Sequence, residues 1–110
     1  MNVRQSLMIA HDHPAFAGHF PGMPILPGAV LLDEALHVIE LGLALDLTQW
    51  QVAGAKFLEI VRPGDALSIE HTSPANGAIG FTVLVADRAG LARPALVGTL
   101  ILATGGARER

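Results

Sequence analysis

The sequence contains no cysteine and has no excess of basic residues, and each absence excludes a class of protein. Without cysteine there is no disulfide framework and no thiol chemistry, which fits the cytoplasm. Seven Lys and Arg against ten Asp and Glu give a formal net charge of −3. That balance supplies no basic field of the kind that nucleic acid binding needs. We therefore expect a cytoplasmic protein that does not bind nucleic acid.

Long uninterrupted apolar runs are also missing. The longest apolar stretch is broken by charged or polar residues before it reaches the roughly 20 residues of a membrane span. The interrupting residues are Asp33, Glu34, His37, Glu40 and Asp46. The first residues also lack the long apolar segment of a signal peptide. We expect no membrane span.

Apolar residues nevertheless dominate what is present. They make up 51% of the 110 residues, whereas charged residues make up 15%. A chain of this length typically forms one domain, and a small domain has much surface for its volume. We therefore expect a single domain over residues 1–104 and a flexible polar tail over residues 105–110. We also expect a homodimer or higher homo-oligomer that covers part of the apolar surface.

Proline and glycine are concentrated in residues 11–28, which read HDHPAFAGHFPGMPILPG. Pro21, Pro24 and Pro27 follow one another at intervals of three. Each fixes its own φ near about −65° and favours an extended conformation of the residue before it. We therefore expect a stiff arm that carries His19 and leads into a helix.

That helix is expected to run from Gly28 to Leu47, because the stretch is rich in Leu and Ala and follows a proline. Apolar residues occur on nearly every side, which predicts a helix that is buried all round. Asp33, His37 and Glu40 are spaced i, i+4 and i+7 and so share one face. One side of a buried helix is thus expected to be polar.

The pattern then changes to short β-type segments separated by turn residues. Together with one segment before the arm they predict five strands, over residues 3–10, 50–61, 66–73, 78–86 and 95–103. Strands joined by short connections pair antiparallel. The expected class is α+β, with an antiparallel sheet wrapped around one long central helix.

Two motifs resemble those of a known family. The first comprises Gly18-His19-Phe20-Pro21-Gly22, Pro24, Pro27-Gly28 and an acid on the helix; the second comprises Lys56-Phe57 and Val61-Arg62-Pro63-Gly64-Asp65. In this order and spacing they resemble the bacterial 3-hydroxyacyl-acyl carrier protein dehydratases of the hotdog fold. The resemblance covers roughly residues 7–103. It is greatest to the short dehydratases of aryl polyene or related pathways.

The resemblance implies roles for particular residues. His19 matches the family's catalytic histidine, and Asp33, 14 positions later, matches its catalytic acid. Gly28 matches the glycine whose N–H faces the thioester carbonyl, with Phe20 and Pro27 as further substrate contacts. The resemblance also implies a dimer in which each site takes its histidine from one subunit and its acid from the other. The partner would be an acyl carrier protein that bears the 3-hydroxyacyl substrate.

The chemistry of these groups suits a dehydration that forms a trans-2-enoyl thioester in fatty acid or polyene-type biosynthesis. A histidine with a pKa of about 6.5 can remove the C2 proton, which is the role of His19. Asp33 would protonate the departing C3 hydroxyl, provided that burial raises its pKa. The Gly28 N–H at a helix N-terminus favours a developing oxyanion. No metal or organic cofactor is needed.

The sequence allows more than one interpretation of two helix residues, His37 and Glu34. The family usually has Gln where this chain has His37, which either pairs with Asp33 and orients it or is only a polar filler. Glu34 points about 100° away from Asp33 around the helix and is expected at the solvent or an interface. A metal site formed by His19, Asp33 and His37 is disfavoured by their spacing.

The other charged residues and histidines are given surface roles. His11, His13 and His71 are interpreted as surface or turn residues. Arg4, Lys56 and Arg62 either contact an acidic carrier protein or are simply solvated, and solvation is favoured. Fold does not fix function, so an acyl thioesterase and a non-catalytic acyl-binding subunit remain alternatives.

Overall fold

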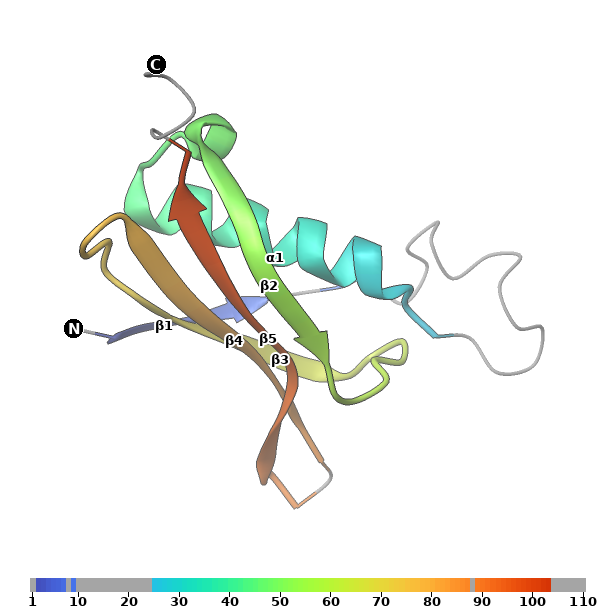
Figure 1. The fold of residues 1–110 in the computed structure, drawn as a ribbon. Coiled ribbons are helices and arrows are strands. Elements are labelled where there is room, and N and C mark those ends of the chain that lie inside the picture. Colours follow the sequence, from blue (N-terminus) through green and yellow to red (C-terminus); the bar gives the residue numbers. More distant parts are fainter. Residues whose placement is uncertain (1, 8, 10–24, 88, 104–110) are drawn as a thin grey trace.

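One helix lies against one five-stranded antiparallel sheet in the computed structural model, which describes residues 2–7, 9, 25–87 and 89–103 (Figure 1). The strands lie in the order β1-β3-β4-β5-β2, so β1 and β2 form the two edges. The elements in chain order are β1 (Asn2–Leu7), α1 (Gly28–Leu43), the 3-10 helix η2 (Leu47–Gln49), β2 (Trp50–Phe57), β3 (Ala66–Thr72), β4 (Ala78–Ala86) and β5 (Ala92–Leu102). The predicted α+β architecture is confirmed.

Alternating burial in the central strands shows which face of the sheet meets the helix. Every second residue of β4 is buried, from Ile79 to Val85, and those between them are half-buried. Strand β3 alternates in the same way. This period of two turns one row of apolar side chains toward α1 and leaves mainly small and polar ones, together with Leu84, on the other face.

Boundaries differ from the prediction by more than one residue in three strands. Strand β1 ends at Leu7, not at residue 10. Strand β5 begins at Ala92 and therefore includes Pro94, because a register shift in its pairing with β4 lies at this point and a bulge tolerates a residue without an N–H. Strand β2 ends at Phe57, not at residue 61. The next N–H, of Leu58, donates to the Ala95 carbonyl at 2.8 Å.

Helix α1 is shorter and less buried than predicted. It ends at Leu43 because Ala44 adopts a left-handed conformation with φ of 50°. Only one stripe of the helix, Leu31, Ala35 and Ile39, is buried. The prediction of a helix buried all round is wrong for the single chain, because one sheet covers only one face of it.

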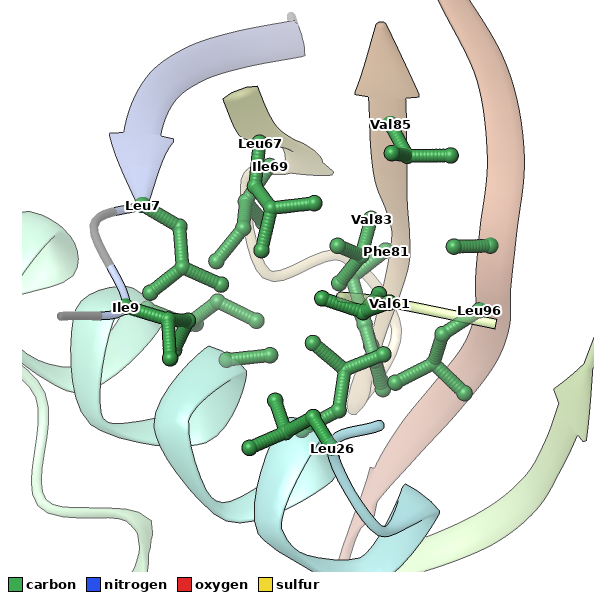
Figure 2. Close-up of a cluster of buried hydrophobic side chains, with 14 of the residues drawn as sticks. Leu7, Ile9, Leu26, Val61, Leu67, Ile69, Phe81, Val83, Val85 and Leu96 are labelled. Atoms are coloured by element: carbon green, nitrogen blue, oxygen red, sulfur yellow. The ribbon is translucent and has the colours of Figure 1, made fainter. Parts of the chain in front are cut away.

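The core fills the space between α1 and the sheet (Figure 2). Ile39 is 0% exposed and packs into this cluster from the helix side. At the other end, the Leu26 N–H donates to the Val61 carbonyl at 2.8 Å, and both side chains are buried. This bond ties the residues just before the helix to those after β2, and so fixes where α1 begins.

His71 is buried, with 1% of its surface exposed, so its interpretation as a surface or turn residue is wrong. It is the last inward-facing residue of β3. Its Nε2 lies 3.0 Å from the Gln5 amide nitrogen, and its Nδ1 lies 3.2 Å from the Thr72 carbonyl oxygen. These contacts suit a neutral imidazole with its proton on Nδ1. The Gln5 amide also lies against Gly42, where any Cβ would collide with it.

The one-sided burial of α1 predicts unequal effects of two truncations on the same helix. Ile39→Ala should lower the free energy of unfolding by about 2–5 kcal/mol, because it leaves a cavity in the core. Leu41→Ala, at a residue that is 68% exposed, should change it by less than about 0.5 kcal/mol. Urea denaturation followed by circular dichroism measures both. Equal losses would contradict one-sided burial.

The buried imidazole predicts a second contrast, between neighbours on β1. Gln5→Leu should destabilise the protein by about 1–3 kcal/mol, because it leaves a buried ring nitrogen without its partner. Arg4→Leu removes an ion pair with Glu70 at 3.3 Å in which both side chains are well exposed, and should cost less than about 1 kcal/mol. Thermal unfolding compares the two, and a larger loss for Arg4→Leu would argue against a structural role for the His71 contact.

Candidate functional site: the exposed face of helix α1

The first residue of the helix, Gly28, lies where close packing leaves no room for a side chain. Pro27 precedes it in an extended conformation, and the Pro27 carbonyl accepts from the N–H groups of Val30 and Leu31 at 3.0 and 3.1 Å. A Cβ on Gly28 would lie 2.9 Å from Cε1 of the Phe57 ring. The first N–H groups of a helix have no partner within it. Gly28 therefore offers a backbone donor beside an aromatic ring.

Asp33 projects from the face of α1 that the sheet does not cover. It is exposed, as are Ala29 and His37, one turn to either side. The burial expected for Asp33 is thus not supplied by the residues that the structure describes. The reason is geometric, since Leu31 and Ala35 beside it turn toward the sheet and direct Asp33 outward.

A hollow of about 230 Å³ lies next to Asp33 on this face. Four of the residues that line it carry ionisable side chains and two are leucines: Asp33, Glu34, Leu36, His37, Glu40 and Leu47. Glu34 is half-buried and belongs to the same hollow as Asp33, although the two point in different directions from the helix. The hollow therefore gathers the polar residues that the sequence placed on the helix.

The segment after the helix is folded back to close one side of this hollow. The Leu47 N–H donates to Glu40 Oε2 at 3.0 Å, which returns the chain to the helix. Asp46 caps the following turn by accepting from the Thr48 N–H at 2.9 Å. Hydrogen bonds from the Thr48 backbone and side chain lower the pKa of Asp46. As a result Leu47 is held at the rim and the Glu40 carboxylate is anchored.

His37 shares the hollow with Asp33 without a hydrogen bond between the two side chains in the described part of the chain. Their spacing of four residues places them on adjacent turns of one face. Both interpretations of His37, as an orienting partner and as a polar filler, therefore stay open. His19 and Phe20 lie outside the described residues, and their roles remain predictions.

The ring of Phe57 lies beside Gly28, a position that the Lys56-Phe57 motif does not indicate. Lys56 is exposed, and the Arg62 N–H donates to Asp65 Oδ2 at 2.8 Å to form the turn before β3. Among the described residues, no group of three or more His, Asp or Glu could hold a metal ion. No described helix is long and apolar enough to cross a membrane.

Relatives with assigned functions match this chain over part of their length. The dehydratase FabZ of Chloroflexus aggregans, named a 3-hydroxyacyl-[acyl-carrier-protein] dehydratase, is 39% identical over 71 residues, which cover 57% of this chain and 49% of the relative. The FabZ of Chlamydia trachomatis serovar L2 is 30% identical over 103 residues, 86% of this chain and 62% of the relative. The chain thus spans about half to three fifths of the length of these relatives.

Solved structures share the fold at lower identity. A chain of the dehydratase heterocomplex ApeI:P from Xenorhabdus doucetiae superposes with a TM-score of 0.69 at 23% identity, over 92% of this chain and 86% of that one. The dehydratase domain of the polyketide PpsC from Mycobacterium tuberculosis gives 0.70 at 18% identity, over 93% and 38%. These likenesses confirm the hotdog fold.

A family model supplies the assignment that the fold alone does not. The model described as ApeI-like, ApeI dehydratase, matches residues 1–93, which include both motifs, the arm and the whole of α1. Two of the motif residues lie on that helix, Gly28 in its first turn and Asp33 beside the hollow. The chain therefore belongs to the ApeI-like dehydratase family.

Proposed function

We propose that this protein is a cytoplasmic hydro-lyase that dehydrates 3-hydroxyacyl groups carried on acyl carrier protein. The proposal is supported by the activity for which its relatives are named and by the family to which the chain belongs. The observation that carries it is the placement of Gly28 and Asp33 on one helix, with Asp33 five residues beyond the first residue of the helix. Five residues of α-helix span about 7.5 Å, enough for one group to meet the thioester carbonyl while the other reaches C3.

The reaction divides between these groups in a simple way. His19 takes the C2 proton, and the electron pair of that bond forms the new C2=C3 double bond. The C3–O bond breaks, and Asp33 gives its proton to the departing oxygen, so that water leaves. The negative charge that develops on the thioester oxygen is stabilised by the Gly28 N–H, where the helix dipole acts in the same direction. No metal or cofactor takes part.

We further propose a homodimer, because the described residues leave Asp33 and the outer edge of β2 uncovered. Among the described residues β2 pairs with β5 alone, so its other edge carries unpaired backbone groups. Phe57, Leu58 and Ile60, in and after this strand, are 49%, 45% and 50% exposed. A second copy that covers this region and the exposed face of α1 would supply the burial that lets Asp33 carry a proton.

Two substitutions test the roles of the proposed acid and base. His19→Ala and Asp33→Asn should each lower kcat for a 3-hydroxyacyl thioester about 100-fold or more, because general acid and base catalysis contribute about 10²–10⁴. Glu34→Gln, in the neighbouring residue of the same hollow, is the matched control and should retain activity. Mass spectrometry of the product distinguishes the enoyl thioester from a free acid. Free acid would indicate a thioesterase, and tight acyl-carrier binding without turnover would indicate a sheltering subunit.

Mixing the two inactive variants tests whether each site is shared between subunits. If His19 and Asp33 come from different subunits, half of the randomly formed dimers are mixed and each contains one intact site. The mixture should then recover roughly a quarter of the wild-type activity. If both groups come from the same chain, mixing recovers nothing.

A further inference from the structure

Three ionisable residues follow one another along one face of α1, and we call them the polar stripe: Asp33, His37 and Glu40. At 100° per residue these three lie within about 60° of one another around the helix. All three line the same hollow. The polar stripe therefore extends the candidate site from Asp33 parallel to the helix axis.

The stripe runs toward the C-terminus of α1, away from Gly28. At 1.5 Å per residue, His37 lies about 6 Å and Glu40 about 10 Å beyond Asp33 along the axis. Glu40 is not free to turn away, because its Oε2 accepts from the Leu47 N–H at 3.0 Å. A group that follows the helix beyond Asp33 thus meets an imidazole first and an anchored carboxylate next.

The proposed function fixes which part of a substrate takes this path, and the inference rests on it. With the thioester carbonyl at Gly28 and C3 at Asp33, the acyl chain advances from the N-terminus of the helix toward its C-terminus. The carbons after C3 then continue toward His37. Leu36 and Leu47 supply the apolar lining of the hollow, beside four ionisable groups.

We infer that the polar stripe, and His37 foremost, sets an upper limit on the length of saturated acyl chain that the site accepts. An apolar channel favours each added methylene by about fourfold in binding, since burying one CH₂ is worth about 0.8 kcal/mol. Along this stripe a methylene would instead displace water from an imidazole or a carboxylate, which opposes binding. The preferred substrate class is therefore short-chain 3-hydroxyacyl thioesters.

A chain-length series on the intact protein tests this inference. The substrates are 3-hydroxybutyryl, 3-hydroxyhexanoyl, 3-hydroxyoctanoyl and 3-hydroxydecanoyl groups on acyl carrier protein, and kcat/KM is measured for each. For the wild type, kcat/KM should stay level or fall from the four-carbon to the ten-carbon chain. A steady rise of about fourfold per methylene would overturn the inference, because that is the behaviour of an apolar channel.

Substitutions at His37 identify the residue that sets the limit. His37→Leu should raise the ratio of kcat/KM for the ten-carbon chain to kcat/KM for the four-carbon chain by roughly tenfold, because only the longer chain reaches His37. His37→Gln keeps a polar group and should preserve the wild-type profile. Leu41→Ala, on an exposed residue one turn further along and outside the hollow, is the matched control and should also preserve it.

The outcomes separate this inference from the proposed function. If no substrate loses water, the proposed function fails and the inference falls with it. If the wild type dehydrates the series and His37→Leu shifts its profile toward longer chains, both stand. If the wild type dehydrates the series but His37→Leu gives the same chain-length profile, the function stands and the stripe does not set the limit.

Discussion

The packing of one helix against one sheet determines most of what this molecule can do. A sheet covers only one face of a helix, and here it buries the stripe Leu31, Ala35 and Ile39. The opposite face is left exposed, yet it carries Leu41 as well as Asp33 and His37. The apolar character of the helix is therefore only partly used within the chain, and the remainder is available to a substrate or a second subunit.

Strand positions could be predicted from the sequence because their signals are local. Alternating apolar residues and turn residues placed β4 at residues 78–86, as observed. The boundaries that differ depend on contacts between segments far apart in the chain. Strand β2 ends where Leu58 begins to donate to Ala95, and β5 includes Pro94 because of a bulge opposite β4. No local pattern indicates either.

Helix α1 shows the same division between local and distant causes. Its start was predictable, because Pro27 and Gly28 suit a helix N-terminus. Its end was not, because Ala44 takes a left-handed conformation that glycine usually provides, and the apolar pattern continues through Leu45 and Leu47. The chain leaves the helix there because Glu40 and Asp46 hold the next turn in place.

The burial of His71 agrees with the alternation along its strand and disagrees with the surface position predicted from its polarity. Every second residue of β3 is buried, as in a strand with one face covered. The buried row is Leu67, Ile69 and His71, so the alternation itself predicts that the histidine faces inward. Its polarity suggested a surface residue instead. The conflict is resolved by Gln5, 66 residues away, which reaches the ring nitrogen from the edge strand. A buried polar group is tolerated where a partner exists, and that partner is visible only in three dimensions.

The positions of two predicted site residues follow from the sequence, but their surroundings do not. The motif predicts roles for Gly28 and Asp33, which stay predictions, and both residues lie on α1, the first at its N-terminus and the second on its exposed face. The sequence could not show that Asp33 is exposed, because burial depends on everything that surrounds a residue. The dehydration that we propose for Asp33 takes place on a substrate away from bulk water. We propose that a second chain supplies the cover, at the outer edge of β2 with its exposed apolar residues. On this proposal assembly and catalysis depend on the same surface, because the second chain that pairs with β2 would also cover Asp33.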